Sequence, residues 1–277
     1  MKRSIGVIIT CTKETDLEAE FEKALAMGLD SCQISIWTPE LYEDDTFAER
    51  IVSALEKKNF TVSALWAGWS GPREWNFTAG PATLGLVPAT YRYQRLQELL
   101  RASDFAEKLG VKHIATHVGF LPENPDNAEY PAIVAALRHL CKYMDKKGQF
   151  FLFETGQETP VTVLRTIQAI GTENLGVNFD MANLILYGKA NPLDALDVFG
   201  QYVMGVHVKD GFYPTDGMSL GREVPAGEGK ANVTAVIQRL DELGYTGAFT
   251  IEREIKGDKQ IADIEKARDL ILSVGKA

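Results

Sequence analysis

Residues 150–180 read FFLFETGQETPVTVLRTIQAIGTENLGVNFD, and this segment indicates the fold most directly. It begins with a short apolar run at 150–154 and ends with a second one at 175–180, and each run has the length of a strand. Between them, Thr159 is a typical helix N-cap residue, and Pro160 occupies the first helical position. Strand, helix and strand in this order predict a parallel βαβ unit.

The same unit recurs along the chain. Further apolar runs of strand length occur at 5–10, 31–37, 61–66, 111–117, 203–208 and 248–252. Helical patterns lie at 17–27, 91–109, 233–243 and 261–274, with Asp16 as an N-cap and with glycine stops at Gly28, Gly110, Gly148 and Gly244. Eight strand–helix units in 277 residues predict an α/β fold of the (β/α)8 TIM barrel type, as one domain over 1–277.

An open, doubly wound sheet is the alternative fold. Such sheets usually carry a glycine-rich phosphate-binding loop directly after the first strand. Here the first strand is followed by CTKETD, residues 11–16, which contains no glycine. The barrel is therefore favoured.

Composition excludes several classes of function. Lys and Arg number 29 against 38 Asp and Glu, so the formal net charge is −9, which opposes nucleic acid and anionic membranes as partners. No apolar run approaches the roughly 20 residues of a membrane span. The N-terminal apolar run, Ile5–Ile9, has five residues, fewer than the roughly 7–15 of a secretory signal. Cys11, Cys32 and Cys141 form neither a disulfide framework nor a CxxC pair. We therefore expect a reduced, cytoplasmic protein.

Two of the predicted strand-to-helix connections are long, at 67–89 and 209–230. In a barrel such connections lie on the C-terminal face, where active sites are found. The first contains Trp69 and Trp75, which follow closely on Trp66. Aromatic rings beside glycines suit a lid over a small polar ligand, and a hydrophobic plug that closes the barrel is the equal alternative.

The last four strand runs each carry a metal-ligand type of side chain near the carboxyl end. These side chains are Glu154, Asp180, His207 and Glu252. If each points inward, strand alternation directs its neighbours outward. Those outward neighbours are all large and apolar: Phe151, Phe153, Val177, Phe179, Val206, Val208, Phe249 and Ile251. Inward positions are mostly small or polar, and Phe150 and Leu152 are expected to fill the barrel interior. The matching phase predicts that the four tips meet at the barrel mouth.

Three carboxylates in one cavity repel one another unless a positive charge lies between them. One divalent cation supplies that charge, and three oxygens with one imidazole suit Mn²⁺ first, with Mg²⁺, Co²⁺ and Zn²⁺ as alternatives. Glu254 has the same phase as Glu252 and competes with it, but lies two residues further out. The alternative is that each residue merely ends its strand and faces solvent.

The order of these motifs resembles the xylose isomerase-like TIM barrel superfamily, and within it the sugar phosphate isomerase/epimerase group that includes ketose 3-epimerases. The resemblance rests on FETGQE, NFDMAN, VHVKD and TIERE at the last four strands, supported by THVGF and PAGEG. It implies that Glu154, Asp180, His207 and Glu252 bind one divalent metal, and that the two glutamates are catalytic as a proton-transfer pair. The epimerases carry a histidine where this chain has Asn183, and their arginine after the seventh strand has Arg222 as its nearest counterpart here.

Six residues are candidates for substrate binding: Trp66, His117, Glu158, Asn183, Lys209 and Arg222. His117 ends the fourth strand, where a structural histidine is the alternative. Glu158 either reaches a substrate hydroxyl or is a solvated residue in the first turn of a helix. Lys209 points to the mouth, where it binds an anionic group or pairs with Asp210.

The segment 227–229 precedes a helix, a place where barrels often hold phosphate. Glu228 in its middle weakens that interpretation, so the substrate is expected to be a small sugar with or without phosphate. Whether the chain forms a homo-oligomer is left open.

The predicted activity is a metal-dependent sugar isomerase or epimerase that transfers a proton through a metal-stabilised ene-diolate. A metal-dependent dehydratase of a keto-polyol, of the inositol-catabolic type, is the main alternative. Less favoured are a Schiff-base aldolase acting through Lys209, an endonuclease IV-like nuclease and a non-catalytic sugar-binding barrel. The nuclease needs several more histidines for its three-zinc site than the four present.

Overall fold

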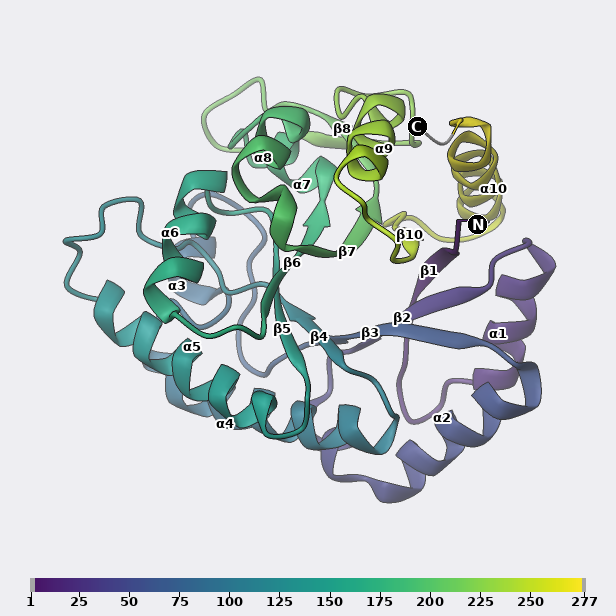
Figure 1. Ribbon diagram of the computed structural model, residues 1–277, viewed down its shortest axis with the longest axis horizontal. Helices are drawn as coiled ribbons and strands as arrows, with labels where there is room; N and C mark the ends of the chain where they lie inside the picture. Colours follow the sequence, from purple (N-terminus) through teal and green to yellow (C-terminus); the bar gives the residue numbers. More distant parts are fainter. Residues whose placement is uncertain (1–2, 276–277) are drawn as a thin grey trace.

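The computed structural model describes residues 3–275, which form a closed barrel of parallel strands inside a ring of helices (Figure 1). Around the barrel the strands follow the order β1 (Ile5–Thr10), β10 (Phe249–Ile251), β7 (Val203–Val208), β6 (Leu175–Asp180), β5 (Phe150–Glu154), β4 (His113–Thr116), β3 (Thr61–Ala67) and β2 (Ser31–Ile36). Strand β1 pairs with both β10 and β2, and so closes the ring. The predicted (β/α)8 barrel is confirmed.

The four helices whose bounds were predicted are present, with ends that differ from the predicted ones by at most three residues. The helices are α1 (Leu17–Ala26), α2 (Asp45–Lys58), α3 (Gly80–Thr83), α4 (Ala89–Lys108), α5 (Tyr130–Asp145), α6 (Pro160–Ile170), α7 (Met181–Leu186), α8 (Pro192–Phe199), α9 (Val233–Glu242) and α10 (Asp258–Ser273), with 3-10 turns η1 (Pro39–Glu43) and η2 (Gly200–Tyr202). Asp16 accepts a hydrogen bond from the N–H of Ala19 at 3.1 Å. Thr159 accepts one from the N–H of Thr162 at 3.4 Å. Both predicted N-caps are therefore confirmed.

The strands bury two separate apolar layers, as their alternation predicts. The outward residues of the last four strands all belong to the main core between barrel and helices. A smaller cluster of Trp66, Ala115 and Leu152 fills the barrel interior, and Phe150 is packed against it. The predicted phase of these strands is confirmed, and that phase turns the tip residues toward the barrel axis.

Some boundaries differ from the prediction. Strand β4 is shorter than 111–117 and β10 is shorter than 248–252, so His117 and Glu252 each lie one residue beyond the end of a strand. The second long connection contains an unpredicted antiparallel hairpin of β8 (Asp210–Phe212) and β9 (Arg222–Val224). Strands of three residues are too short to show a periodic pattern. Across residues 3–275, no helix combines the length and the apolar character that crossing a membrane requires.

Candidate metal centre

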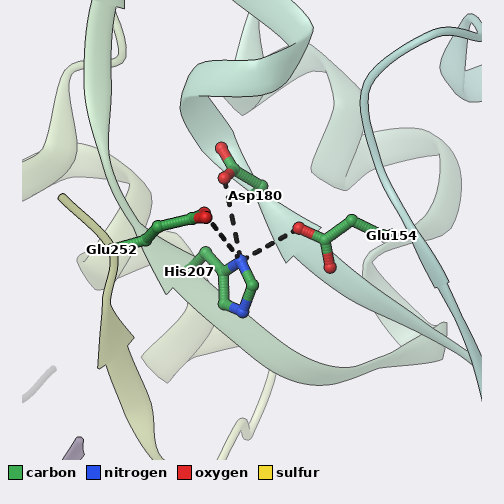
Figure 2. Close-up of side chains that lie close together, drawn as sticks. All are labelled: Glu154, Asp180, His207 and Glu252. Atoms are coloured by element: carbon green, nitrogen blue, oxygen red, sulfur yellow. Dashed lines mark ion pairs between the residues drawn. The ribbon is translucent and has the colours of Figure 1, made fainter. Parts of the chain in front are cut away.

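Four side chains from neighbouring strands meet at the C-terminal mouth of the barrel. Glu154 ends β5, Asp180 ends β6, His207 lies on β7 and Glu252 follows β10. Each offers one ligand atom, and these four atoms lie within 4.8 Å of one another. The Nδ1 atom of His207 is 2.9 Å from Oε1 of Glu154, 3.1 Å from Oε2 of Glu252 and 3.7 Å from Oδ2 of Asp180 (Figure 2).

The pairing of the strands explains why these side chains meet. Asp180 and His207 are direct partners across β6 and β7, and Thr250 of β10 is the partner of His207 on its other side. Glu252 follows Thr250 by two residues and therefore returns to the same face. Parallel strands end at the same edge of a sheet, so the tips of β5, β6, β7 and β10 lie next to one another.

The donor set fits a divalent cation. Oδ1 of Asp180 accepts the N–H of Asn183 at 2.7 Å, but the other oxygen, Oδ2, is buried and has no hydrogen-bond partner. A buried carboxylate oxygen without a partner is costly, and a cation between it and the neighbouring carboxylates removes that cost. Three carboxylates and one imidazole are hard or borderline ligands that suit Mg²⁺, Mn²⁺, Co²⁺ or Zn²⁺.

The electrostatics of the centre are tightly coupled. Burial opposes ionisation of Glu252, but the charges of Lys209 and His207 hold its pKa well below the ordinary value. Burial also disfavours the charged form of His207, yet the carboxylates of Glu154 and Glu252 raise its pKa well above 6.5. Binding of a cation by this imidazole therefore competes with its protonation.

Lys209 forms part of the same charge network. Its Nζ lies 2.5 Å from Oε1 of Glu254, 3.4 Å from Oε2 of Glu252 and 3.7 Å from Oδ2 of Asp180. Burial works against its charge, but these carboxylates raise the pKa of Lys209 well above 10.5. The predicted pairing with Asp210 is wrong, because Lys209 pairs with these three carboxylates while the carboxylate of Asp210 accepts backbone N–H groups.

A cavity of about 600 Å³ opens above the centre, within the size range of small-molecule sites. Glu154 and Glu252 lie in its lining, together with a wall of Trp37, Trp66 and Trp75. The ring centroids of Trp37 and Trp66 are 4.7 Å apart, and those of Trp37 and Trp75 are 6.2 Å apart.

The tryptophans of the 67–89 connection lie in two different environments, one buried and one at the cavity. Trp69 is fully buried, donates its indole N–H to Oγ1 of Thr116 at 3.2 Å and lies under the guanidinium of Arg95 at 3.9 Å, so it packs between the end of β4 and α4. Trp75 is 38% exposed and lines the cavity. Trp37 joins the cluster from the end of β2, which sequence reasoning missed because Trp37 is remote from the others along the chain.

Four of the six substrate-binding candidates line the cavity: Trp66, already described, and His117, Asn183 and Lys209. His117 is buried, its Nδ1 has no hydrogen-bond partner, and burial lowers its pKa. Its ring lies 5.1 Å from that of Trp75. A neutral imidazole with a free nitrogen at a cavity wall suits a hydrogen bond to a substrate hydroxyl.

The other two candidates are placed elsewhere. Arg222 lies on β9, is exposed, and stacks its guanidinium 5.1 Å from the ring centroid of Phe212, outside the lining of the cavity. Glu158 is also absent from that lining, but it is only 2% exposed, so the solvated interpretation is wrong. Residues 155–158 of the β5–α6 connection are all buried, and Glu158 is buried with them.

The buried carboxyl of Glu158 leads to a prediction of pH dependence. Burial raises its pKa to about 8 from 4.5. A carboxyl with a higher pKa in the folded than in the unfolded state stabilises the fold fully below about pH 4.5, and this contribution is lost as the pH rises through about 8. We therefore expect the free energy of unfolding of Glu158→Gln to fall less than that of the wild type between about pH 5 and pH 8.

Urea unfolding at a series of pH values checks this expectation. Glu173→Gln, which changes an exposed glutamate at the other end of the barrel, is the matched control and should follow the wild-type profile. Parallel profiles for Glu158→Gln and the wild type would contradict the prediction.

The loop that resembles a phosphate site is already filled by the chain itself. Oδ2 of Asp210 accepts the N–H groups of Gly227 at 3.0 Å and Gly229 at 2.9 Å, and Oδ1 accepts that of Ala231 at 2.9 Å. A Cβ on Gly229 would lie 2.2 Å from Oδ1 of Asp210, so only glycine allows this approach. The donors that would hold a phosphate are therefore satisfied by a carboxylate.

Removal of this carboxylate should destabilise the protein. Asp210→Ala leaves several backbone N–H groups around a buried position without an acceptor, and we expect the free energy of unfolding to fall by about 1–3 kcal/mol. Asp216→Ala removes a carboxylate that also accepts two backbone N–H groups, but in an exposed loop, and should change it by less than about 0.5 kcal/mol. Urea denaturation measures both, and equal losses would contradict the assignment.

The comparisons with known proteins agree with this geometry. A family model described as xylose isomerase-like TIM barrel matches residues 21–273, so the chain belongs to this family. The structure of a xylose isomerase domain protein from Planctomyces limnophilus is 32% identical, with a TM-score of 0.90, over 99% of this chain and 98% of that one. A xylose isomerase-like TIM barrel protein from Mycobacterium smegmatis, in complex with magnesium, is 18% identical, with a TM-score of 0.74, over 99% and 96%.

More distant structures carry the same fold with different activities. An L-ribulose 3-epimerase is 18% identical, with a TM-score of 0.70, over 98% of this chain and 93% of that one. A probable 3-DHS dehydratase from Bacillus anthracis is 15% identical, with a TM-score of 0.70, over 98% and 100%. An uncharacterized protein from Methanocaldococcus jannaschii is 29% identical over 114 residues, and the match spans 41% of this chain and about a third, 36%, of that curated relative.

Proposed function

We propose that this protein is a divalent-metal-dependent isomerase or epimerase of a small sugar. The observation that carries the proposal is that four ligand atoms lie within 4.8 Å of one another beside a cavity. The two glutamates among these ligands line the cavity, together with a wall of tryptophans. Tryptophan faces suit the C–H faces of a sugar, and the convergent polar groups suit its oxygens. The family match, and the fold that the chain shares with an L-ribulose 3-epimerase, support the same activity.

The chemistry proposed for the site is proton transfer next to a carbonyl. A divalent ion held by Glu154, Asp180, His207 and Glu252 would polarise the carbonyl of the sugar and stabilise negative charge on its oxygen. Glu154 and Glu252 place their carboxylates on two sides of Nδ1 of His207, from β5 and from the end of β10. One carboxylate removes the proton from the carbon beside the carbonyl, and the other returns a proton.

The remaining residues bind and orient the substrate in this proposal. His117 and Asn183 offer hydrogen bonds from the cavity wall, and Trp66 and Trp75 pack against carbon atoms and exclude water. The backbone N–H groups of the loop at 227–231 already have acceptors within the chain, which favours a sugar without phosphate at that place.

Elimination of water is the second candidate, because the site also holds an acid. The protonated ammonium of Lys209 lies 3.4 Å from Oε2 of Glu252, where it can donate a proton to a leaving hydroxyl. The same charge argues against the Schiff-base aldolase, since a lysine whose pKa is held well above 10.5 is not a nucleophile. The net charge of −9 argues against the nuclease.

Carbon–hydrogen exchange tests the proposal. The Mn²⁺-loaded or Mg²⁺-loaded protein is incubated in deuterated water with a panel of keto-sugars and keto-polyols, and NMR follows the loss of the C–H signal next to the carbonyl. An isomerase or epimerase incorporates deuterium without loss of mass, whereas a dehydratase lowers the product mass by one water. No exchange in any substrate, or equal exchange after chelation, would overturn the proposal.

A further inference from the structure

Two buried amides lie inside the barrel beside the metal centre, and the proposed function makes no use of them. Gln33 on β2 is 1% exposed and Asn178 on β6 is fully buried, and neither lines the cavity. Nε2 of Gln33 donates to Oδ1 of Asn178 at 2.9 Å, and Nδ2 of Asn178 donates to Oε2 of Glu154. Nε2 of His207 lies 2.8 Å from Oε1 of Gln33. The amides thus connect two of the four ligand residues.

An ionised Glu154 fixes the orientation of both amides. An ionised carboxylate such as Glu154 only accepts hydrogen bonds, so Asn178 must present its NH₂ group to it and turn Oδ1 toward Gln33. Gln33 must then present its own NH₂ group to that oxygen, which leaves its Oε1 facing His207. Nε2 of His207 therefore faces both Oε1 of Gln33 at 2.8 Å and Nδ2 of Asn178 at 3.0 Å. When Nδ1 holds a metal ion, the one proton of the neutral imidazole lies on Nε2 and is donated to Oε1 of Gln33.

The neighbouring strand makes room for this arrangement. Gly205 on β7 is the partner of Asn178 in the strand register. A Cβ on Gly205 would lie 2.1 Å from Oδ1 of Asn178, a distance that no side chain can accept. Glycine inside a strand is unfavourable unless another group must approach closely. Glycine at position 205 therefore leaves room for the side-chain amide of Asn178.

We propose that Gln33 and Asn178 are positioning residues that hold the His207 ring through contacts with Nε2, so that Nδ1 points at the metal position. The inference rests on the proposed metal site and adds to it the residues that prepare the site before an ion binds. A histidine ligand commonly donates its second ring N–H to a fixed acceptor, and loss of that acceptor typically weakens metal binding by about 10- to 100-fold.

A purely structural pair of amides would behave differently. Such a pair would stabilise the fold through buried hydrogen bonds and leave the affinity for metal unchanged. The chain offers a matched comparison in Gln149, which is also buried, and whose amide donates to the carbonyl of Ser103 and accepts from its hydroxyl, away from the metal centre. Methionine at either position keeps the length of the side chain and removes both polar atoms.

The first test measures the dissociation constant of Mn²⁺ by isothermal titration calorimetry. We expect Gln33→Met to raise it by about 10- to 100-fold and Gln149→Met to leave it within about twofold of the wild type. Equal constants for Gln33→Met and the wild type would overturn the inference. Absence of Mn²⁺ binding to the wild type would instead overturn the proposed metal site, so the two failures are distinguishable.

The second test uses the wild-type protein, so it can be carried out even if Gln33→Met does not fold. The chain has four histidines, so nitrogen-15 NMR of the Zn²⁺-loaded or Mg²⁺-loaded wild type can resolve the ring nitrogens of His207. We expect a protonated Nε2 and an unprotonated Nδ1. A proton on Nδ1 and none on Nε2 in the metal-loaded protein would refute the inference.

Discussion

Replacement of either Glu154 or Glu252 by glutamine is expected to lower kcat by about 10²- to 10⁴-fold, the range for loss of a general acid or base. Glutamine keeps the size of the side chain and an oxygen that can face the metal position, but it cannot take up or return a proton. The rate of C–H exchange in the most active sugar, measured at a metal concentration that saturates each variant, checks this result.

Glu173→Gln is the matched control for this experiment, because it makes the same chemical change at an exposed site before β6. It should retain the wild-type rate, and circular dichroism should show the same fold for all three variants. Wild-type exchange rates in both Glu154→Gln and Glu252→Gln would remove the pair from the mechanism. A loss in only one of them would assign the proton transfer to that carboxylate.

Metal binding should produce the largest change in stability. Addition of Mg²⁺ or Mn²⁺ to chelator-treated protein at about 100 times the dissociation constant is expected to raise the free energy of unfolding by about 2.7 kcal/mol. The physical reason is that three carboxylates lie within 4.8 Å of one another at the metal position, with a buried oxygen of Asp180 left without a partner. Urea unfolding with and without the metal measures the effect.

Asp180→Asn distinguishes the role of Asp180 as a metal ligand from its role in the local structure. Asp180 is also the N-cap of α7, and asparagine is an equally good cap, so the helix should begin at the same residue. The variant loses the negative charge at the metal position, and the stabilisation by metal should largely disappear. An undiminished stabilisation in Asp180→Asn would show that the ion binds elsewhere.

The four candidate ligands could be predicted because alternation along a strand is a local property. Large apolar residues such as Phe153, Phe179 and Val206 mark the outward face, so the tips between them must point inward. The choice between Glu252 and Glu254 needed more than phase. Strand β10 ends at Ile251, and the side chain of Glu254 is 61% exposed and turns to Lys209.

The supporting residues could not be predicted in the same way. Gln33 lies in the run SCQISI, which reads as an ordinary buried strand, and its hydrogen-bond partner Asn178 is 145 residues away along the chain. Likewise, the place of Trp37 in the cavity wall depends on its contact with Trp75, which comes from a different connection. No short pattern records such pairs, because the barrel brings them together through closure of the whole sheet.

The sequence by itself determined the barrel, the inward phase of its last strands and the four residues that end in one place, since these follow from periodicity and from the parallel arrangement of strands. Only the tertiary structure decided which charges and amides face each other. In the folded chain, Asp210 accepts backbone N–H groups of a loop, Lys209 forms an ion pair with Glu254, and Gln33 contacts the ring of His207. Hydrogen bonds and ion pairs depend on distances of a few ångströms between remote segments, and these distances are set by packing rather than by local pattern.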